Sequence, residues 1–408
     1  MIETTSSSLR SQRWMLLFGL AAVLLLAFAL RVHLLGAQSL WGDEGSSYVQ
    51  ATRSFADIAT NAGQDIHPPL YYWTLAIWRA LAGETEFALR SLSAFASLLT
   101  VALTYALARR IAMARWAAVL AAAFVALNTF SLYYAQEARM YALLALWSAA
   151  GAWMLLALIE RPSWKRAAAL GLINAAGLWT QYAFPLVMIA QGAAFVAILL
   201  VGAPMNQRDP EARAQHAAPL RVWAMYISAN LLALIVFAPW IPTALHQIGG
   251  WGQAGGGYDT QTALSIIVRW LTLGLTAGDV TMAIPFLLAI AGLIAPVRGA
   301  PVRASTQAGG RDLRWLAPVL LAAIPSVLFL ALGLARESNL KFLLPAQIGA
   351  AVWLARGVWV ITKLKITPSP VRSSSGLPLA AQFSPSLSTG GAEPLSSPSP
   401  LPHGCSST

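Results

Sequence analysis

Apolar stretches of about 20 residues recur along this chain, and they constrain its fold more than any other feature. A helix rises about 1.5 Å per residue, so each stretch is long enough to cross a hydrocarbon layer about 30 Å thick. Of the 408 residues, 57% are hydrophobic and only 11% are charged, which excludes an ordinary water-soluble globule. The sequence therefore predicts an all-α polytopic membrane protein.

The hydropathy pattern predicts about ten membrane-crossing helices. The first apolar stretch, from Trp14 to Leu30, follows two arginines and has the composition of a signal peptide, but we expect it to be a retained anchor. The expected spans are 14–32, 88–108, 116–134, 141–159, 167–183, 185–202, 222–241, 281–297, 315–335 and 342–362.

Basic residues set the expected orientation of these spans. Lys and Arg gather in alternate loops, and placing those loops on the cytoplasmic face puts both chain termini inside. The net charge of +11 therefore reports topology and not nucleic-acid binding. Two further apolar segments, 67–83 and 263–278, mix aromatic and basic residues, and we expect them to lie along the outer surface as interfacial helices. The alternative is that the two segments cross the membrane as a pair.

The chain divides into two predicted parts. Residues 1–365 form the transmembrane domain, and its first outer loop, 33–87, carries acidic residues and one interfacial helix. Residues 366–408 form a Ser- and Pro-rich tail that we expect to be disordered and cytoplasmic. The single cysteine, Cys405, lies in this tail, so the sequence offers neither an internal disulfide nor a cysteine-rich metal site.

The acidic residues avoid the middle of the expected spans and gather in the outer loops. A proton-coupled or ion-coupled carrier commonly places carboxylates near the midplane, so this distribution favours chemistry on a lipid-borne group at the outer surface. Asp43 and Glu44 follow the first span, and repulsion between adjacent carboxylates can leave one of them the better base. Alternatively, the pair is the acidic start of a helix that Ser39 caps.

Three further residues at the outer surface are candidates for binding. His67 precedes two prolines that fix the start of a helix, and it is either a structural hydrogen-bonding group or a ligand or base. Arg139 lies in a short turn between two spans, where its planar guanidinium suits a lipid phosphate unless it only extends to water. Lys341, at the start of the last span, is either a second phosphate contact or a topological anchor.

Nucleotide-binding fingerprints and an H-E-x-x-H pair do not occur in the sequence. We therefore expect the free energy that drives the reaction to come from the substrate itself and not from a nucleotide.

Four motifs occur in order between Leu40 and about Gln191. They are Asp43-Glu44, His67-Pro68-Pro69-Leu70-Tyr71-Tyr72, Glu86-Phe87-Ala88-Leu89-Arg90-Ser91 and Gln136-Glu137-Ala138-Arg139-Met140-Tyr141. Together they resemble the large family of protein mannosyltransferases and their bacterial relatives, which include the aminoarabinose transferases that modify lipid A.

This resemblance implies a membrane glycosyltransferase of the GT-C fold in the plasma (inner) membrane, with its site on the non-cytoplasmic face. The implied reaction moves a hexosyl or pentosyl group from a polyprenyl-phosphate donor to a hydroxyl on a protein, lipid or glycan. By position, Asp43 would be the catalytic base, with Glu44 and Glu137 completing an acidic site. The implied substrate-binding residues are His67, Tyr71, Arg139, Tyr141 and Lys341.

Three features of the sequence leave parts of this assignment open. Relatives often carry Arg-Tyr before a Leu-Pro near the last span, whereas this chain has Lys341-Phe342, and a lysine lacks the bidentate geometry of arginine. We expect no metal or other cofactor, although Asp43, Glu44, Asp65 and His67 offer hard ligands. The competing hypothesis is a non-enzymatic carrier or flippase of a lipid-linked sugar, which would need no base.

Overall fold

The computed structural model describes residues 2–201, 210–249, 257–276, 283–293 and 313–364. All of them belong to the first of the two units into which the chain divides, residues 1–366. The expected tail at 366–408, with Cys405, lies outside the described residues. Within the described ranges the secondary structure is helical and contains no strand, which confirms the all-α prediction.

Each of the expected spans contains a helix. The helices are α1 (Ile2–Val32), α5 (Glu86–Arg110), α6 (Arg115–Leu127) followed by α7 (Thr129–Ala135), α8 (Tyr141–Glu160), α9 (Trp164–Thr180), α10 (Phe184–Val201), α11 (Pro210–Phe237), α14 (Ala283–Leu293), α15 (Leu316–Ala331) and α16 (Leu344–Leu364). By length and composition, five segments of the described chain can cross a membrane, or six if the bent pair α6 and α7 is one span. The expected number of ten crossings is therefore not confirmed, because α9, α10, α14 and α15 are not among these segments, the last three being apolar but short.

The long helices pack through small residues as well as through large apolar ones. Helix α16 lies against α14, α15, α6 and α8, and α8 in turn packs on α5 and α9. At Gly349 and Gly357, α16 comes so close to its neighbours that a Cβ atom would collide with the carbonyl oxygens of Pro318 and Leu288. Such small-residue contacts let helix backbones approach closely in a membrane-type bundle.

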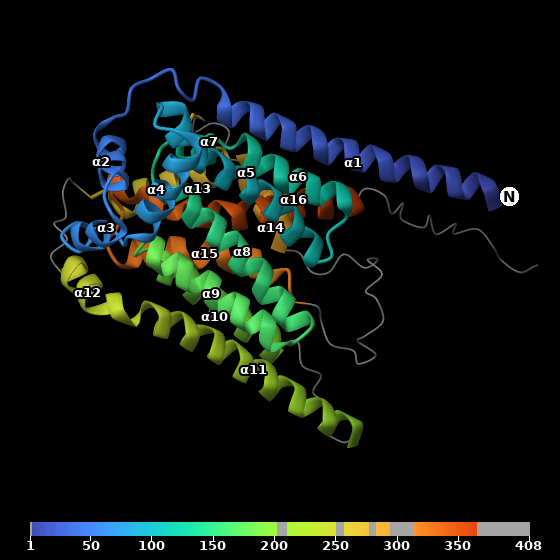
Figure 1. The fold of residues 1–408 in the computed structure, drawn as a ribbon. Helices are drawn as coiled ribbons and strands as arrows, with labels where there is room; N and C mark the ends of the chain where they lie inside the picture. Colours follow the sequence, from blue (N-terminus) through green and yellow to red (C-terminus); the bar gives the residue numbers. More distant parts are fainter. Residues whose placement is uncertain (1, 202–209, 250–256, 277–282, 294–312, 365–408) are drawn as a thin grey trace, which may run out of the picture. The chain divides into compact units, whose positions relative to one another are not determined.

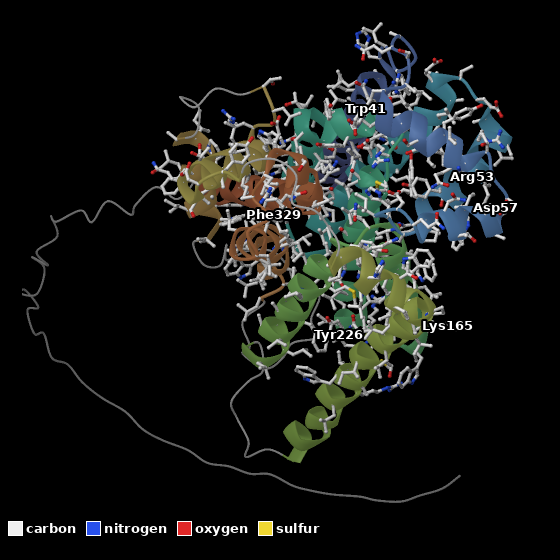
Figure 2. All side chains as sticks on the ribbon, turned by 90° about the vertical axis from the view of Figure 1, so that its left-hand side faces the viewer. Trp41, Arg53, Asp57, Lys165, Tyr226 and Phe329 are labelled. Carbon is white, nitrogen blue, oxygen red and sulfur yellow. The ribbon has the colours of Figure 1, made fainter. Side chains whose placement is uncertain are left out.

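Several short helices gather at one end of the long helices. They are α2 (Gly42–Ala51), α3 (Phe55–Ala62), α4 (Leu70–Ala82), α12 (Ile241–Gly249), which follows the 3-10 turn η1 (Ala238–Trp240), and α13 (Thr260–Thr272), together with the 3-10 turn η3 (Glu337–Leu343) before α16. Figure 1 shows α2, α3, α4 and α12 at this end, and Figure 2 looks onto it, with Arg53 and Asp57 labelled beside each other. Helices α4 and α13 are the two segments expected at the surface; each has 13 residues, and neither is long enough to cross a membrane.

The expectation of one continuous helix over 116–134 is wrong. The helix breaks at Asn128, and α6 and α7 meet at an angle of 59°. The side-chain oxygen of Asn128 accepts hydrogen bonds from the backbone N–H groups of Phe130 and Ser131, so it caps the start of α7. Arg31, fully buried at the end of α1, donates to the carbonyl of Ala126 at 3.2 Å and so satisfies part of the free end of α6.

Candidate active site

The turn between α7 and α8, residues 136–140, is fixed to the end of α1. The side-chain nitrogen of Gln136 donates hydrogen bonds to the carbonyls of Leu30, Arg31 and His33, at 2.9 to 3.3 Å. Because these carbonyls lie at the C-terminal end of a helix, they have few partners within α1 itself. The turn that carries Glu137 and Arg139 is therefore attached to the segment that leads into α2.

Glu44 is buried in a closed network of hydrogen bonds. Its two carboxylate oxygens accept from Arg90 Nε at 2.8 Å and Arg90 Nη2 at 2.6 Å, and Oε1 also accepts the backbone N–H of Ala138 at 2.8 Å. Glu44 Oε2 lies 3.3 Å from the backbone nitrogen of Trp41, the residue that precedes α2. Glu44 is 1% exposed and does not line the cavity described below, so it holds α2, α5 and the 136–140 turn together.

Arg90 extends this network to the loop after α1. It donates to the backbone carbonyls of Leu35, Gln38 and Ser39 at 2.8 to 3.1 Å. Of the alternative interpretation, the acidic helix start is found, but Ser39 does not cap it: Trp41 is at the N-cap position, and the carbonyl of Ser39 accepts from Arg90. Sequence reasoning gave Arg90 no role; a buried arginine inside an otherwise apolar helix was the available signal.

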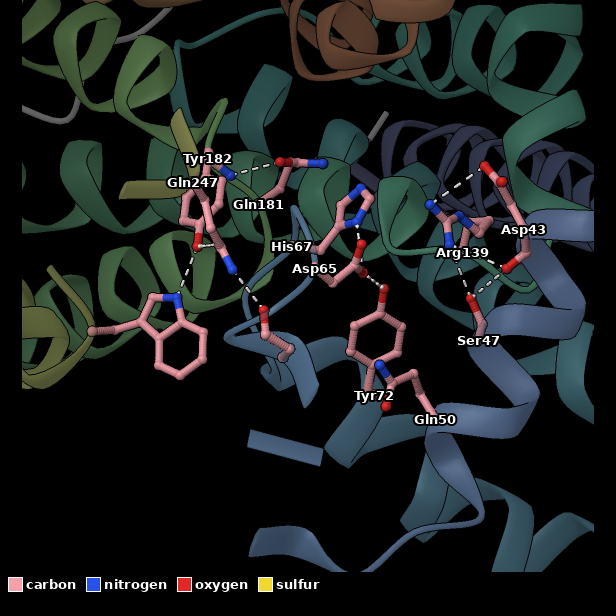
Figure 3. A network of polar contacts seen from close by, with 12 residues as sticks. Asp43, Ser47, Gln50, Asp65, His67, Tyr72, Arg139, Gln181, Tyr182 and Gln247 are labelled. Atoms are coloured by element: carbon pink, nitrogen blue, oxygen red, sulfur yellow. Dashed lines mark hydrogen bonds and ion pairs between the residues drawn. The ribbon is translucent and has the colours of Figure 1, made fainter. Parts of the chain in front are cut away.

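Asp43, next to Glu44 in the first turn of α2, faces the other way. Its side chain is 45% exposed, and Oδ2 lies 3.5 Å from Nη2 of Arg139. Arg139 Nη1 donates to the backbone carbonyl of Asp43 at 3.2 Å and to Oγ of Ser47 at 3.1 Å (Figure 3). One guanidinium from the 136–140 turn thus contacts both the backbone and the side chain of Asp43.

A cavity of about 1010 Å³ opens beside this pair. Asp43 and Arg139 form part of its wall, and residues of the loop before α4, the segment 333–336 and η3 form much of the remainder. Its acidic and basic lining residues are Asp43, Arg53, Asp65, His67, Arg139, Arg336 and Lys341. The cavity therefore combines two carboxylates with four permanently basic side chains.

The loop before α4 contributes a second polar group to the cavity. His67 Nδ1 lies 3.4 Å from Oδ2 of Asp65, and the hydroxyl of Tyr72 donates to the same oxygen at 3.2 Å (Figure 3). Burial lowers the pKa of His67, and the positive charges of Arg139 and Lys341 add to this effect against the opposing effect of Asp65. Burial alone would raise the pKa of Asp65, but its hydrogen bonds with His67, with Tyr72 and with the backbone of Ile66 hold it below its ordinary value. At neutral pH the loop therefore presents a neutral imidazole backed by a carboxylate.

Tyr141, at the start of α8, lies between two cations. Lys341 Nζ lies 4.9 Å from the centre of the Tyr141 ring, and Cζ of Arg139 lies 5.9 Å from it. Both distances are within the range of cation–π attraction. Tyr71, in contrast, is fully buried in α4 and does not line the cavity, and its hydroxyl has no hydrogen-bond partner in the described structure.

Glu137 is buried close to the cavity wall without forming part of it. Burial and repulsion from Glu44 raise its pKa to about 7, although a hydrogen bond with Tyr133 and the charges of Lys341 and Arg139 oppose the shift. This carboxyl group therefore changes protonation state near neutral pH. Burial and the charges of neighbouring side chains set this pKa.

The candidate site residues from the sequence thus fall into two groups. Asp43, His67, Arg139 and Lys341 line one cavity, with Tyr141 packed behind the last two. Glu44, Glu137 and Tyr71 are buried and do not line it. Within the described residues, no three His, Cys, Asp or Glu side chains come together in a group suited to a metal ion.

The comparisons with known proteins agree with the motif-based resemblance. Residues 66–242 match the family model described as dolichyl-phosphate-mannose-protein mannosyltransferase. The matched region contains His67 and Arg139, while Asp43 and Lys341 lie outside it. A search of curated protein sequences finds no match to this chain.

Two solved structures share the fold at low sequence identity. The crystal structure of the Archaeoglobus fulgidus oligosaccharyltransferase, a complex with Zn and sulfate, aligns with a TM-score of 0.50 at 14% identity, over 85% of this chain and 49% of that chain. The crystal structure of ArnT from Cupriavidus metallidurans, bound to undecaprenyl phosphate, aligns with a TM-score of 0.52 at 16% identity, over 87% of this chain and 60% of that chain. Both are GT-C glycosyltransferases, so the expected fold is confirmed. The chain spans about half the length of the first protein and three fifths of the second.

Proposed function

We propose that this chain, a multi-pass membrane protein of the GT-C fold that resembles the protein mannosyltransferases over residues 66–242, is a glycosyltransferase. It transfers a hexosyl or pentosyl group from a polyprenyl-phosphate donor to a hydroxyl acceptor. The observation that carries the proposal is the contact of Arg139 with Asp43 in the wall of one cavity, which combines a candidate base with a phosphate-binding group. The ArnT structure, bound to undecaprenyl phosphate, supports the donor class.

Asp43 is the candidate general base of this reaction. The acceptor oxygen attacks the anomeric carbon of the sugar while the carboxylate of Asp43 takes the hydroxyl proton. The bond between that carbon and the phosphate oxygen breaks, and the lipid phosphate leaves with the electron pair. A single displacement of this kind inverts the configuration at the sugar, and a positioned base contributes roughly 10²- to 10⁴-fold to the rate. The partial exposure of Asp43 to the cavity gives an acceptor access to it.

Arg139 and Lys341 are the candidate groups for the leaving phosphate. Charge grows on this phosphate in the transition state, and fixed cations aimed at such charge are often the largest single contribution to catalysis. Arg139 supplies a planar fork held by Asp43 and Ser47, and Lys341 supplies a point charge beside the Tyr141 ring. The 3.5 Å separation of Arg139 from the carboxylate of Asp43 is long for an ion pair, so a phosphate can compete for the guanidinium.

The other predicted site residues act through these groups in our proposal. Glu44 is a positioning residue, since its carboxylate is fully occupied by Arg90 and by backbone N–H groups. Glu137 sets the electrostatic environment of the turn that carries Arg139, and Tyr141 packs against the cations. Tyr71 supports the wall from behind, and His67 contacts the substrate.

We place the site on the non-cytoplasmic face of the plasma (inner) membrane. The distribution of Lys and Arg among the loops favours cytoplasmic termini, and the short helices around the cavity lie at the end of the bundle where α1 leads into α2. The acceptor is a hydroxyl on a protein, a lipid or a glycan.

The test uses the purified protein in liposomes with radiolabelled polyprenyl-phosphate sugars and a panel of hydroxyl acceptors. We expect wild type to transfer the sugar, and Asp43→Asn to bind the donor with wild-type affinity but to transfer it at least 100-fold more slowly. Asp57→Asn, an exposed carboxylate of α3 outside the cavity, is the matched control and should keep full activity. Donor movement across the bilayer without transfer, unaffected by Asp43→Asn, would establish the carrier alternative and overturn the proposal.

A further inference from the structure

One buried side chain of the cavity, His67, has no defined role in the proposed transfer beyond contact with the substrate. His67 is 7% exposed and lines the cavity, and its Nδ1 is held by Asp65, which is held in turn by Tyr72. Nε2, the other ring nitrogen, forms no hydrogen bond with any described residue. A buried histidine fixed on one side and open toward a cavity on the other has the arrangement of a recognition group.

The hydrogen-bond chemistry of Asp65 defines the tautomer of His67. A carboxylate accepts hydrogen bonds and donates none, so Nδ1 of His67 carries the proton that faces Oδ2 of Asp65. In the neutral ring, Nε2 then carries a lone pair and acts as an acceptor. Burial and the nearby charges of Arg139 and Lys341 lower the pKa of His67, and therefore keep the ring in this neutral form.

The position of His67 relative to the cations indicates which part of the substrate it faces. Arg139 and Lys341 act electrostatically on the His67 ring, and both line the same cavity. These are the side chains assigned above to the donor phosphate. That phosphate joins the sugar to the polyprenyl chain, and of these two groups only the sugar carries hydroxyls, so the sugar is the part of the donor that suits the polar ring of His67.

We propose that Nε2 of His67 accepts a hydrogen bond from a hydroxyl of the transferred sugar, and that the donor sugar is neutral and not an amino sugar. The inference rests on the proposed glycosyltransferase function and adds a substrate class to it. Asp65 is a positioning residue in this proposal, because it fixes the tautomer and the orientation of the ring.

The charge of the cavity supports a neutral sugar. Four basic side chains line the cavity against two carboxylates, Asp43 and Asp65, and Asp65 is already engaged with His67. An ammonium group on the sugar would therefore meet a lining in which basic side chains outnumber carboxylates by four to two. Like charges in such a site oppose binding, whereas a hydroxyl carries no such penalty.

The experiment compares donors that differ at one position of the sugar. Polyprenyl-phosphate donors are prepared with a neutral pentose or hexose, with the same sugar lacking one hydroxyl in turn, and with an amino group in place of that hydroxyl. The variants are His67→Phe, which removes the acceptor, and His67→Gln, which keeps a side-chain oxygen. His246→Gln, an exposed histidine of α12 outside the cavity, is the matched control.

We expect His67→Phe to lower kcat/KM about tenfold for the neutral donor, with partial recovery in His67→Gln. One deoxy donor should lose a similar factor with wild type and lose nothing further with His67→Phe. The amino donor should bind wild type at least about tenfold more weakly than its hydroxyl counterpart. An equal loss for every donor, the deoxy donors included, or a preference for the amino donor would overturn the inference.

Asp65→Asn provides a second variant if His67→Phe does not fold. It weakens the hold on Nδ1 while keeping the imidazole, so it should reduce discrimination between the hydroxyl donor and the same deoxy donor. Unchanged discrimination in Asp65→Asn would overturn the role given to Asp65. Failure of wild type to bind or transfer any of these donors would instead remove the proposed function itself, a result distinguishable because it needs no variant.

Discussion

Arg139 contacts Asp43 at two points, with Nη1 3.2 Å from the backbone carbonyl and Nη2 3.5 Å from the carboxylate, although 96 residues separate them in sequence. The first contact fixes the backbone of the first turn of α2 relative to the 136–140 turn. The second leaves the carboxylate close enough to the guanidinium to share one substrate. A change in the shape of Arg139 should therefore disturb the base and the phosphate contact together.

The first prediction concerns Arg139→Lys. Lysine keeps the positive charge but cannot serve the Asp43 carbonyl, the Asp43 carboxylate and Ser47 with one planar fork. We expect kcat to fall on the order of 100-fold, with KM for the donor changed only a few-fold, in steady-state assays of sugar transfer. Arg53→Lys, on the same cavity but without contact to Asp43, is the control. Wild-type kcat in Arg139→Lys would contradict the assigned role.

Part of this site could be predicted from the sequence. Spacing and topology brought the motifs of Asp43, His67, Arg139 and Lys341 to one face, and the structure brings all four to one cavity. The separation of Asp43 from Glu44 could not be predicted, because adjacent residues of a helix point in directions about 100° apart and only the packing shows which one faces the cavity. Arg90, the partner of Glu44, lies 46 residues further along the chain. Each residue belongs to a different motif, and the motifs alone do not show that the two side chains meet.

In the fold, as in the site, features set by local sequence could be predicted, whereas features set by contacts between distant residues could not. Each stretch that hydropathy marked contains a helix, because the apolar composition of a stretch is a local property. The break at Asn128 depends on contacts with Arg31 and with the segment around Trp270, which lie far away in the chain. The Asn-Thr dipeptide there was a local signal, since asparagine favours the N-cap position.

The second prediction concerns the buried ion pair between Glu44 and Arg90. Removing one partner leaves an uncompensated buried charge, so Glu44→Gln and Arg90→Met should each lower the free energy of unfolding by roughly 3–5 kcal/mol. The double variant should lose less than the sum of the two single losses. Denaturant titrations in detergent or bilayers measure these values.

The exposed pair of Arg79 and Glu84 is the control for this prediction. Their side chains are 24% and 54% exposed, and such a surface pair contributes only about 0–1 kcal/mol. Arg79→Met should therefore change stability far less than Arg90→Met. Equal losses at the two pairs would show that the Glu44 network does not hold the site together.

The third prediction concerns Glu137 and pH. Its pKa in the folded protein, about 7, lies above its ordinary value of 4.5, so the folded state binds a proton more tightly than the unfolded state. The resulting stability is complete below about pH 4.5 and is lost as pH rises through about 7, a change of roughly 3 kcal/mol.

Glu137→Gln should flatten the dependence of unfolding free energy on pH between about 4.5 and 7. The variant should also be more stable than wild type near pH 8, because it carries no buried charge there. Thermal unfolding across this pH range provides the measurement, and Glu86→Gln, a partly exposed carboxylate at the start of α5, serves as the control. An unchanged pH profile in Glu137→Gln would contradict the assignment of this titration to Glu137.

The fourth prediction tests whether close backbone approach holds α16 in the bundle. A methyl group at Gly357 would collide with the carbonyl of Leu288 in α14, and one at Gly349 with the carbonyl of Pro318 in α15. Because each obstacle is backbone, helices must separate to admit the methyl group, and we expect Gly349→Ala and Gly357→Ala each to lower stability by about 1–3 kcal/mol. Gly19→Ala in α1 meets no atom within 4 Å and should be neutral or slightly stabilising, since alanine favours the helix.

Gly349→Ala and Gly357→Ala should also impair sugar transfer, because α16 follows directly from η3, which carries Lys341 into the cavity. Wild-type stability in both would mean that α16 is held by its large apolar side chains instead.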